Sequence, residues 1–177
     1  MLASRLLDFL VHHHLTDKPL IVGYSGGLDS CVLLHLLAQI RPHLSVNPGA
    51  IYVNHGLSPH ADSWQAHCEA QANALGLDFS AVKVELVKGS RTSMEQLARD
   101  ARYQAFVQHT PQDAVVLTAH HQDDQAETLL LRLFRGSGLK GLGAMQALRK
   151  LDDTRLLARP LLSLSRQSLK HTRRKMR

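Results

Sequence analysis

Short, nearly continuous apolar runs alternate along this chain with longer stretches in which apolar residues recur every three or four positions. The runs have the length of strands, and the recurring positions have the spacing of a helix with one apolar side. Strands are predicted at residues 19–24, 50–53, 79–86, 114–119 and 155–158. Helices are predicted at residues 2–11, 62–75 and 93–108. Another helix follows a glycine-rich turn after the first strand and ends near residue 40, and one runs from residue 123 to Gly136, where it stops. A last helix is predicted to begin after Ser163 or Ser165.

This order of elements predicts an α/β fold. Strands that are apolar on both sides pair in parallel and lie between layers of helices, as in a doubly wound parallel sheet. Such a sheet binds its ligand beyond the carboxyl ends of its strands. In the helix that begins at Asp123, the spacing of Leu129, Leu130 and Leu133 predicts that these side chains are buried. Ser93 is the expected N-cap of the helix before it.

Length and composition limit the class of protein. A chain of 177 residues is about one domain with a single core. No apolar run approaches the roughly 20 residues of a membrane-spanning helix, and the first residues do not resemble a secretory signal, so we expect a cytoplasmic protein with no membrane segment. Cys31 and Cys68 belong to no Cys-x-x-Cys pair, which favours reduced thiols over a zinc or iron–sulfur site.

Positive charge is concentrated in the last fifth of the chain. Residues 1–139 carry 10 Lys and Arg against 13 Asp and Glu, a net charge of −3. Residues 140–177 carry 11 against 2, a net charge of +9. A separate basic segment is typical of contact with a polyanion through its phosphates. Composition alone leaves open the alternative of a solvated tail.

A glycine-rich loop, Ser25-Gly26-Gly27-Leu28-Asp29-Ser30, follows the first predicted strand and opens a helix. Two glycines allow a tight turn that directs successive N–H groups toward one anion, and the helix N-terminus adds its dipole. The hydroxyls of Ser25 and Ser30 can donate to phosphate oxygens, and Asp29 beside a phosphate indicates an intervening cation such as Mg²⁺. The chain contains neither the Walker sequence nor the dinucleotide-binding glycine pattern. The loop therefore predicts a phosphate site of another kind.

A second polar block, residues 118–128, begins where the most strand-like run ends. Its carboxylates would occupy the first turns of the following helix, where the helix dipole favours negative charge. The dipole does not explain the two adjacent histidines, His120 and His121, that precede Asp124 and Glu127. We therefore predict a functional site at this strand end.

The Ser-Gly-Gly-x-Asp-Ser loop resembles the hallmark of the PP-loop ATP pyrophosphatases. Together with motifs at residues 53–57, 95–103 and 118–142, it makes residues 19–160 similar to the lysidine synthetase branch of that family. The resemblance implies a Rossmann-like adenine nucleotide alpha-hydrolase fold. It also implies that ATP and Mg²⁺ are used to adenylate the wobble cytidine of a minor tRNA(Ile) with a CAU anticodon, and that L-lysine then displaces AMP. Whether the chain forms a homodimer stays open.

The resemblance assigns roles to individual residues. The implied catalytic residues are Asp29, His121, Asp124 and Glu127. The implied nucleotide-binding residues are Ser25, Gly26, Gly27, Leu28, Asp29, Ser30, His55, Arg132 and Arg135, and Asp29 is also the implied magnesium ligand.

Two regions and three activities follow as expectations. Residues 1–160 are predicted to form the PP-loop domain, and residues 161–177 a basic segment that begins a continuation, because the resembling sequences extend further into tRNA-binding domains. Lysidine synthesis is the favoured activity. A related tRNA thiolase is expected to use paired cysteines, which this chain lacks. An ATP- or AMP-binding relative without catalysis would not need the histidine and carboxylates of the second block.

Overall fold

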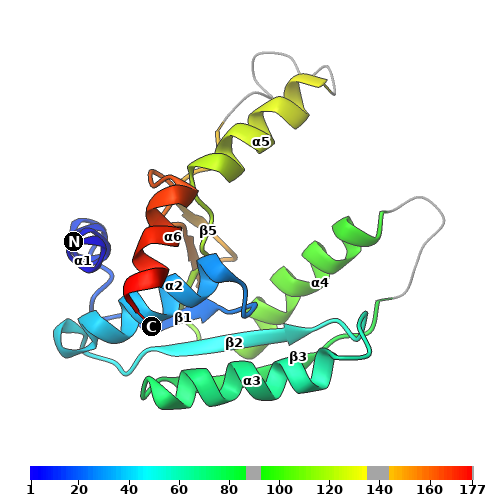
Figure 1. Cartoon of the computed structure of the whole chain (residues 1–177), viewed down its shortest axis with the longest axis horizontal. Coiled ribbons are helices and arrows are strands. Elements are labelled where there is room, and N and C mark those ends of the chain that lie inside the picture. The colour runs from blue at the N-terminus through cyan, green and yellow to red at the C-terminus, as the bar shows by residue number, and fades with distance from the viewer. Residues whose placement is uncertain (87–92, 135–143, 177) are drawn as a thin grey trace.

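The computed structural model describes residues 1–86, 93–134 and 144–176 (Figure 1). Its strands are β1 (Leu20–Gly23), β2 (Gly49–Asn54), β3 (Asp78–Lys83), β4 (Val115–Leu117), β5 (Leu148–Lys150) and β6 (Leu156–Ala158). Its helices are α1 (Leu2–His12), α2 (Leu28–Ile40), α3 (Ala61–Ala74), α4 (Met94–His109), α5 (Gln122–Phe134) and α6 (Arg166–Lys175), with a short 3₁₀ turn, η1 (Arg41–His43), after α2.

The strands form one sheet in the order β3-β2-β1-β4-β6-β5. All neighbouring strands are parallel except β5, which pairs antiparallel with β6. The predicted doubly wound parallel sheet is thus confirmed, with one antiparallel edge strand that the apolar pattern did not indicate. The strand order reverses between β1 and β4, and doubly wound sheets bind ligands at this switch point.

Alternate residues of the strands face two different helical layers. Leu20 and Val22 of β1 join the larger core cluster, to which α1, α2, α3 and α6 contribute. Ile21, between them, packs against the smaller cluster around Phe106 of α4. Because a strand turns successive side chains to opposite faces, a run that is apolar throughout must be covered on both sides. This explains why the strand predictions succeeded from short apolar runs.

Two helices begin at serine caps. The side chain of Ser93 accepts a hydrogen bond from the backbone N–H of Gln96 at the start of α4. Ser165 accepts one from the N–H of Ser168 at the start of α6, which decides between the two predicted caps. Each cap satisfies one of the N–H groups that lack an intrahelical partner.

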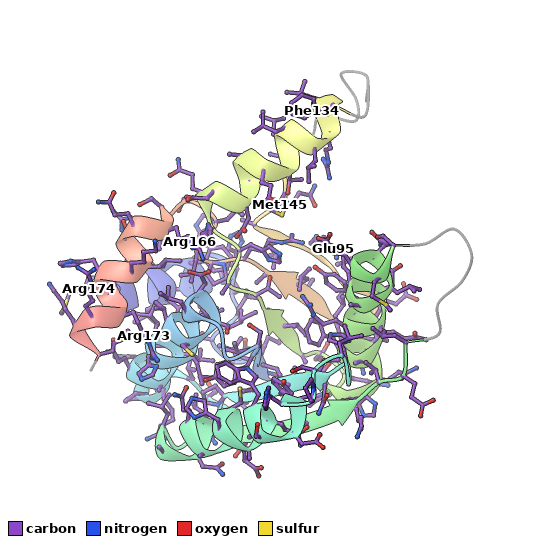
Figure 2. The ribbon with its side chains drawn as sticks, turned by 45° about the vertical axis from the view of Figure 1, so that its right-hand side comes forward. Glu95, Phe134, Met145, Arg166, Arg173 and Arg174 are labelled. Carbon is purple, nitrogen blue, oxygen red and sulfur yellow. The ribbon has the colours of Figure 1, made fainter. Side chains whose placement is uncertain are left out.

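Helix α5 differs from its prediction because it projects from the body of the protein (Figure 1). Leu129, Leu130 and Leu133 were expected to be buried, and this was wrong: their exposed fractions are 41%, 52% and 50%. Helical spacing shows which residues share a side, but it cannot show whether another element covers that side. The base of α5 is held by Gln125, whose side chain forms hydrogen bonds with the backbone N–H and C=O of Met145. Met145 lies beside this end of the helix (Figure 2). The leucines of α5 do not make it a membrane span: no helix in the described part of the chain is long and apolar enough to cross a membrane.

Candidate nucleotide site and catalytic cluster

The glycine-rich loop connects β1 to α2 at the switch point of the sheet. Gly26 has a φ of 75°, in the left-handed region that glycine adopts without a steric penalty. The hydroxyls of Ser25 and Ser30 lie 3.1 Å apart, and the Ser30 hydroxyl donates to the carbonyl of Gly27 at 3.0 Å. These contacts close the loop on itself and fix its curvature.

The first turn of α2 faces the loop without a side-chain cap. Its N-cap is Gly27, and among the residues that the structure describes no side chain caps this helix start. The N–H groups of Leu28, Asp29 and Ser30 therefore lack intrahelical partners, and together with the helix dipole they favour an anion. The side chain of Leu28 packs against the core, so its contribution to the loop is through the backbone.

Helix α3 supports the loop from outside, which the sequence did not indicate. The indole Nε1 of Trp64 donates to the carbonyl of Ser25 at 3.0 Å. The hydroxyl of Tyr24, the residue before the loop, donates to Oε1 of Gln71 at 2.6 Å. A Cβ atom on Gly26 would lie 2.7 Å from Trp64 Nε1, so this position has no room for a side chain.

The two predicted blocks meet through three side chains. Nε2 of His121 lies 3.5 Å from Oδ2 of Asp29, and its Nδ1 lies 3.4 Å from Oδ2 of Asp124. The backbone N–H of His121 donates to the same Asp124 oxygen at 2.8 Å. His121 is 4% exposed and has one of these carboxylates near each of its ring nitrogens.

A pocket of about 460 Å³ opens in front of this cluster, at the carboxyl ends of the central strands. The loop contributes Ser25, Asp29 and Ser30 to its lining, the strand ends contribute His55, Thr118 and His120, α4 contributes Arg99, Arg102 and Tyr103, and α3 contributes Trp64. The sequence did not predict a role for the α4 residues. Their spacing places them on one side of the helix, but only the packing of α4 shows that this side faces the loop.

Two pocket histidines have lowered pKa values, which favour the neutral form. Burial, together with Arg102, lowers the pKa of His55. Burial and then Arg159 lower the pKa of His120 to about 4. The Nδ1 atom of His120 lies at hydrogen-bond distance, 2.9 Å, from the Thr118 hydroxyl. A neutral imidazole beside bound phosphates can accept or donate a hydrogen bond without adding charge.

The low pKa of His120 predicts a loss of stability in acid. Protonation favours the unfolded chain, whose histidines titrate near 6.5, so the free energy of unfolding should fall as the pH drops from about 6.5 to about 4. The expected loss from this group is on the order of 3 kcal/mol. His120→Gln, which keeps a partner for Thr118, should remove that part of the pH dependence. Urea unfolding of both proteins between pH 7.5 and 4 measures it, and parallel curves would contradict the assignment.

Two of the remaining predicted residues, Glu127 and Arg132, are not part of the pocket lining. Glu127 is on the exposed part of α5 and borders a separate shallow hollow with Leu130 and Leu131. Arg132 is half-buried in the last turn of the same helix. Arg135 lies outside the described residues. The structure thus brings Asp29, His121 and Asp124 together and does not bring Glu127 to them.

The carboxylate of Asp29 has an unsatisfied oxygen. Its Oδ1 is buried and has no hydrogen-bond partner among the described residues. In the described part of the chain, no group of three or more His, Cys, Asp or Glu side chains could hold a metal ion by itself. Mg²⁺ is commonly bound by one or two carboxylates together with substrate phosphates and water, so the residues present fit this ion when a nucleotide is bound.

Comparison with known proteins agrees with this geometry. The family model of the PP-loop domain matches residues 2–177. The chain belongs to the PP-loop family. Membership in this ATP-binding family implies the use of ATP, and it confirms the resemblance to the PP-loop family that the loop predicted.

Curated relatives of this PP-loop domain are named tRNA(Ile)-lysidine synthase. The protein from Pseudomonas aeruginosa is 52% identical over 84% of this chain and 33% of its own length, and that from Alkalilimnicola ehrlichii is 50% identical over the same shares. The protein from Pseudomonas syringae pv. tomato is 48% identical over 95% of this chain and 37% of its own length. The chain therefore spans about a third of the length of the curated relatives it matches.

Solved structures with little sequence similarity share the fold. The U34-tRNA thiolase NcsA from Methanococcus maripaludis superimposes with a TM-score of 0.79 over 98% of this chain and 62% of its own, at 16% identity. The NMN synthetase from Francisella tularensis gives a TM-score of 0.57 over 98% of this chain and 68% of its own, at 15% identity. Both likenesses support the fold, and neither bears on the substrate.

Proposed function

We propose that this chain is the PP-loop catalytic domain of a cytoplasmic tRNA(Ile)-lysidine synthetase. Its substrates would be ATP, L-lysine and a tRNA(Ile) with a CAU anticodon, and its products the lysidine-containing tRNA, AMP and pyrophosphate. The observation that carries the proposal is the cluster of Asp29, His121 and Asp124 behind the phosphate loop. It occurs in a chain about half identical to proteins named for this reaction.

The proposed reaction has two steps. The C2 carbonyl oxygen of the wobble cytosine attacks the α-phosphorus of ATP, and the bond to pyrophosphate breaks. The amine of lysine then attacks C2 of the activated base, and AMP leaves. The loop from Ser25 to Ser30 would hold the β- and γ-phosphates as the leaving group, because its N–H groups and the first turn of α2 favour negative charge.

The charged residues of the pocket support the first step. Arg99 and Arg102 line the side of the pocket formed by α4, where they could offset negative charge that develops on the transferring phosphoryl group. Asp29 would hold Mg²⁺, which when bound neutralises phosphate charge. His121 and Asp124 would fix the position of Asp29 from behind, since His121 lies between both carboxylates.

The two alternatives have less support. Sulfur transfer of the thiolase kind is expected to need reactive thiols. Cys31 and Cys68 are both buried. Burial, and to a smaller extent the nearby Cys31, raises the pKa of Cys68 to about 11. A nucleotide-binding relative without catalysis would not need a buried histidine between two carboxylates. The cluster therefore argues against a relative without catalysis, and the buried thiols argue against sulfur transfer.

The products of the reaction test the proposal. Since the chain spans about a third of its relatives, the assay uses the chain joined to the remaining part of the Pseudomonas aeruginosa relative. Pyrophosphate should be released from ATP when the tRNA is present, AMP should appear only when lysine is added as well, and the tRNA should gain one lysine. Release of ADP and orthophosphate, or AMP formation that ignores the tRNA, would remove the chain from this reaction class.

A further inference from the structure

The most strongly basic surface of the described chain lies on α6. The helix carries Arg166, Lys170, Arg173, Arg174 and Lys175 and has no acidic residue. Its apolar side is already occupied, because Leu169 is completely buried in the core against α2. The outward side therefore presents only polar and charged groups, with Arg174 standing on the outer side of the helix (Figure 2).

Two arginines that precede α6 in the basic segment are used within the fold. Arg155 pairs with Asp152 at 2.8 Å and donates to the carbonyl of Thr110. Arg159 is 3% exposed and donates to the carbonyl of Gln146 at 2.8 Å. By contrast, no cation of α6 forms an ion pair with a carboxylate among the residues that the structure describes. The positive charge that remains available to a partner is thus concentrated on this helix.

The start of α6 is attached to the catalytic block. The backbone N–H of Gln122 donates to the carbonyl of Leu164 at 2.9 Å. The backbone N–H of Arg166 donates to Oδ1 of Asp123 at 3.3 Å. A polyanion that lies along α6 would therefore be guided to the strand end that carries His121 and Asp124.

We propose that α6 binds the phosphate backbone of the RNA substrate and directs it toward the pocket. Arg166, Lys170 and Arg174 recur every four residues, so they form one stripe with a spacing of about 6 Å along the axis. Evenly spaced cations suit a backbone that repeats a charge at each nucleotide. A membrane-binding helix needs a free apolar side to enter the lipid, and this side of α6 is packed against α2. The inference rests on the proposed function because it takes the substrate to be RNA.

Salt-dependent binding tests this surface. Fluorescence anisotropy of a labelled tRNA(Ile) transcript is measured over a salt series, without ATP, for the 177-residue chain and two double variants. Lys170→Gln with Arg174→Gln removes two exposed charges from α6. Lys83→Gln with Lys150→Gln removes two exposed charges from β3 and β5. The α6 variant should bind more weakly, and its slope of log affinity against log salt should shrink by about 0.7 to 0.9 for each phosphate that is no longer neutralised.

The control should keep the slope of the parent chain, and circular dichroism should show that both variants fold. Equal slopes for the two variants, or no binding of tRNA by the parent chain at low salt, would overturn the role of α6. Binding to anionic phosphatidylglycerol vesicles that exceeds RNA binding and disappears in the α6 variant would assign the surface to lipid instead. If α6 fails this test while the completed protein still forms AMP and pyrophosphate from ATP when tRNA and lysine are present, only the assignment of α6 is overturned.

Discussion

Replacing Gly26 with alanine should abolish most of the ATP affinity of the PP-loop. The left-handed conformation at φ 75° costs an alanine about 1–2 kcal/mol. The added Cβ would also lie 2.7 Å from both Trp64 Nε1 and Cys68 Sγ, and overpacking of this kind costs about 1–3 kcal/mol. Because α3 blocks the outer side, the loop must change its curvature, and the N–H groups of the first turn of α2 then no longer converge. We expect the affinity for ATP, measured by calorimetry, to fall by roughly a hundredfold, which corresponds to about 2.7 kcal/mol.

A second glycine provides a matched control for the backbone. Gly56 has a similar φ of 63°, but a Cβ there would meet no atom within 4 Å. Gly56→Ala should therefore cost only the backbone contribution, about 1 kcal/mol of unfolding free energy. The free energy of unfolding is therefore measured for both variants, and the difference between them isolates the contact of the loop with Trp64 and Cys68. An ATP affinity of Gly26→Ala within threefold of the parent chain would show that the loop does not depend on this support.

Local sequence patterns predicted most of the fold because they depend on near neighbours. The strand of residues 115–117 and the cap at Ser93 follow from apolar runs and from side-chain chemistry within a few positions. The exposure of Leu130 on α5 could not be predicted in this way, since it depends on which element lies opposite the helix. The antiparallel strand β5 was not predicted from the sequence, because two of its three residues are Arg149 and Lys150 and it therefore contains no apolar run.

The candidate site was predictable in part for the same reason. The loop around Asp29 and the block around His121 were recognisable because each lies in one short segment, and topology then brings both segments to the switch point. Trp64 contacts the loop from a helix almost forty positions away in the chain, and no local signal indicates this contact. The α4 arginines lie in a motif that the sequence displayed, but their direction toward the pocket required the packed helix.

The largest catalytic effect is expected from Asp124→Asn. Asp124 accepts the backbone N–H of His121 at 2.8 Å, and the same oxygen lies 3.4 Å from the imidazole Nδ1. Asparagine keeps the shape of the side chain but removes its charge, so His121 loses the nearer of the two carboxylates beside its Nδ1. If the cluster fixes Asp29 for the transfer step, the rate of AMP formation in the completed protein should fall by about 10² to 10³. The affinity for ATP should change little, because the phosphate loop itself is untouched.

Asp123→Asn makes the same chemical change one position earlier and serves as the control. The Asp123 side chain is 59% exposed, lies 3.9 Å from His121 Nδ1 and accepts the backbone N–H of Arg166, a bond that the amide oxygen of asparagine can also accept. Its charge is better screened by water, so its loss should slow AMP formation less than threefold by our estimate. Single-turnover formation of AMP from ATP, with tRNA and lysine in excess, measures both variants. Comparable losses in the rate of AMP formation in the two variants would mean that this rate depends on the total negative charge at the start of α5. A large loss confined to Asp124→Asn would mean that the contact with His121 carries the effect, and near-normal turnover of Asp124→Asn would remove this residue from the site.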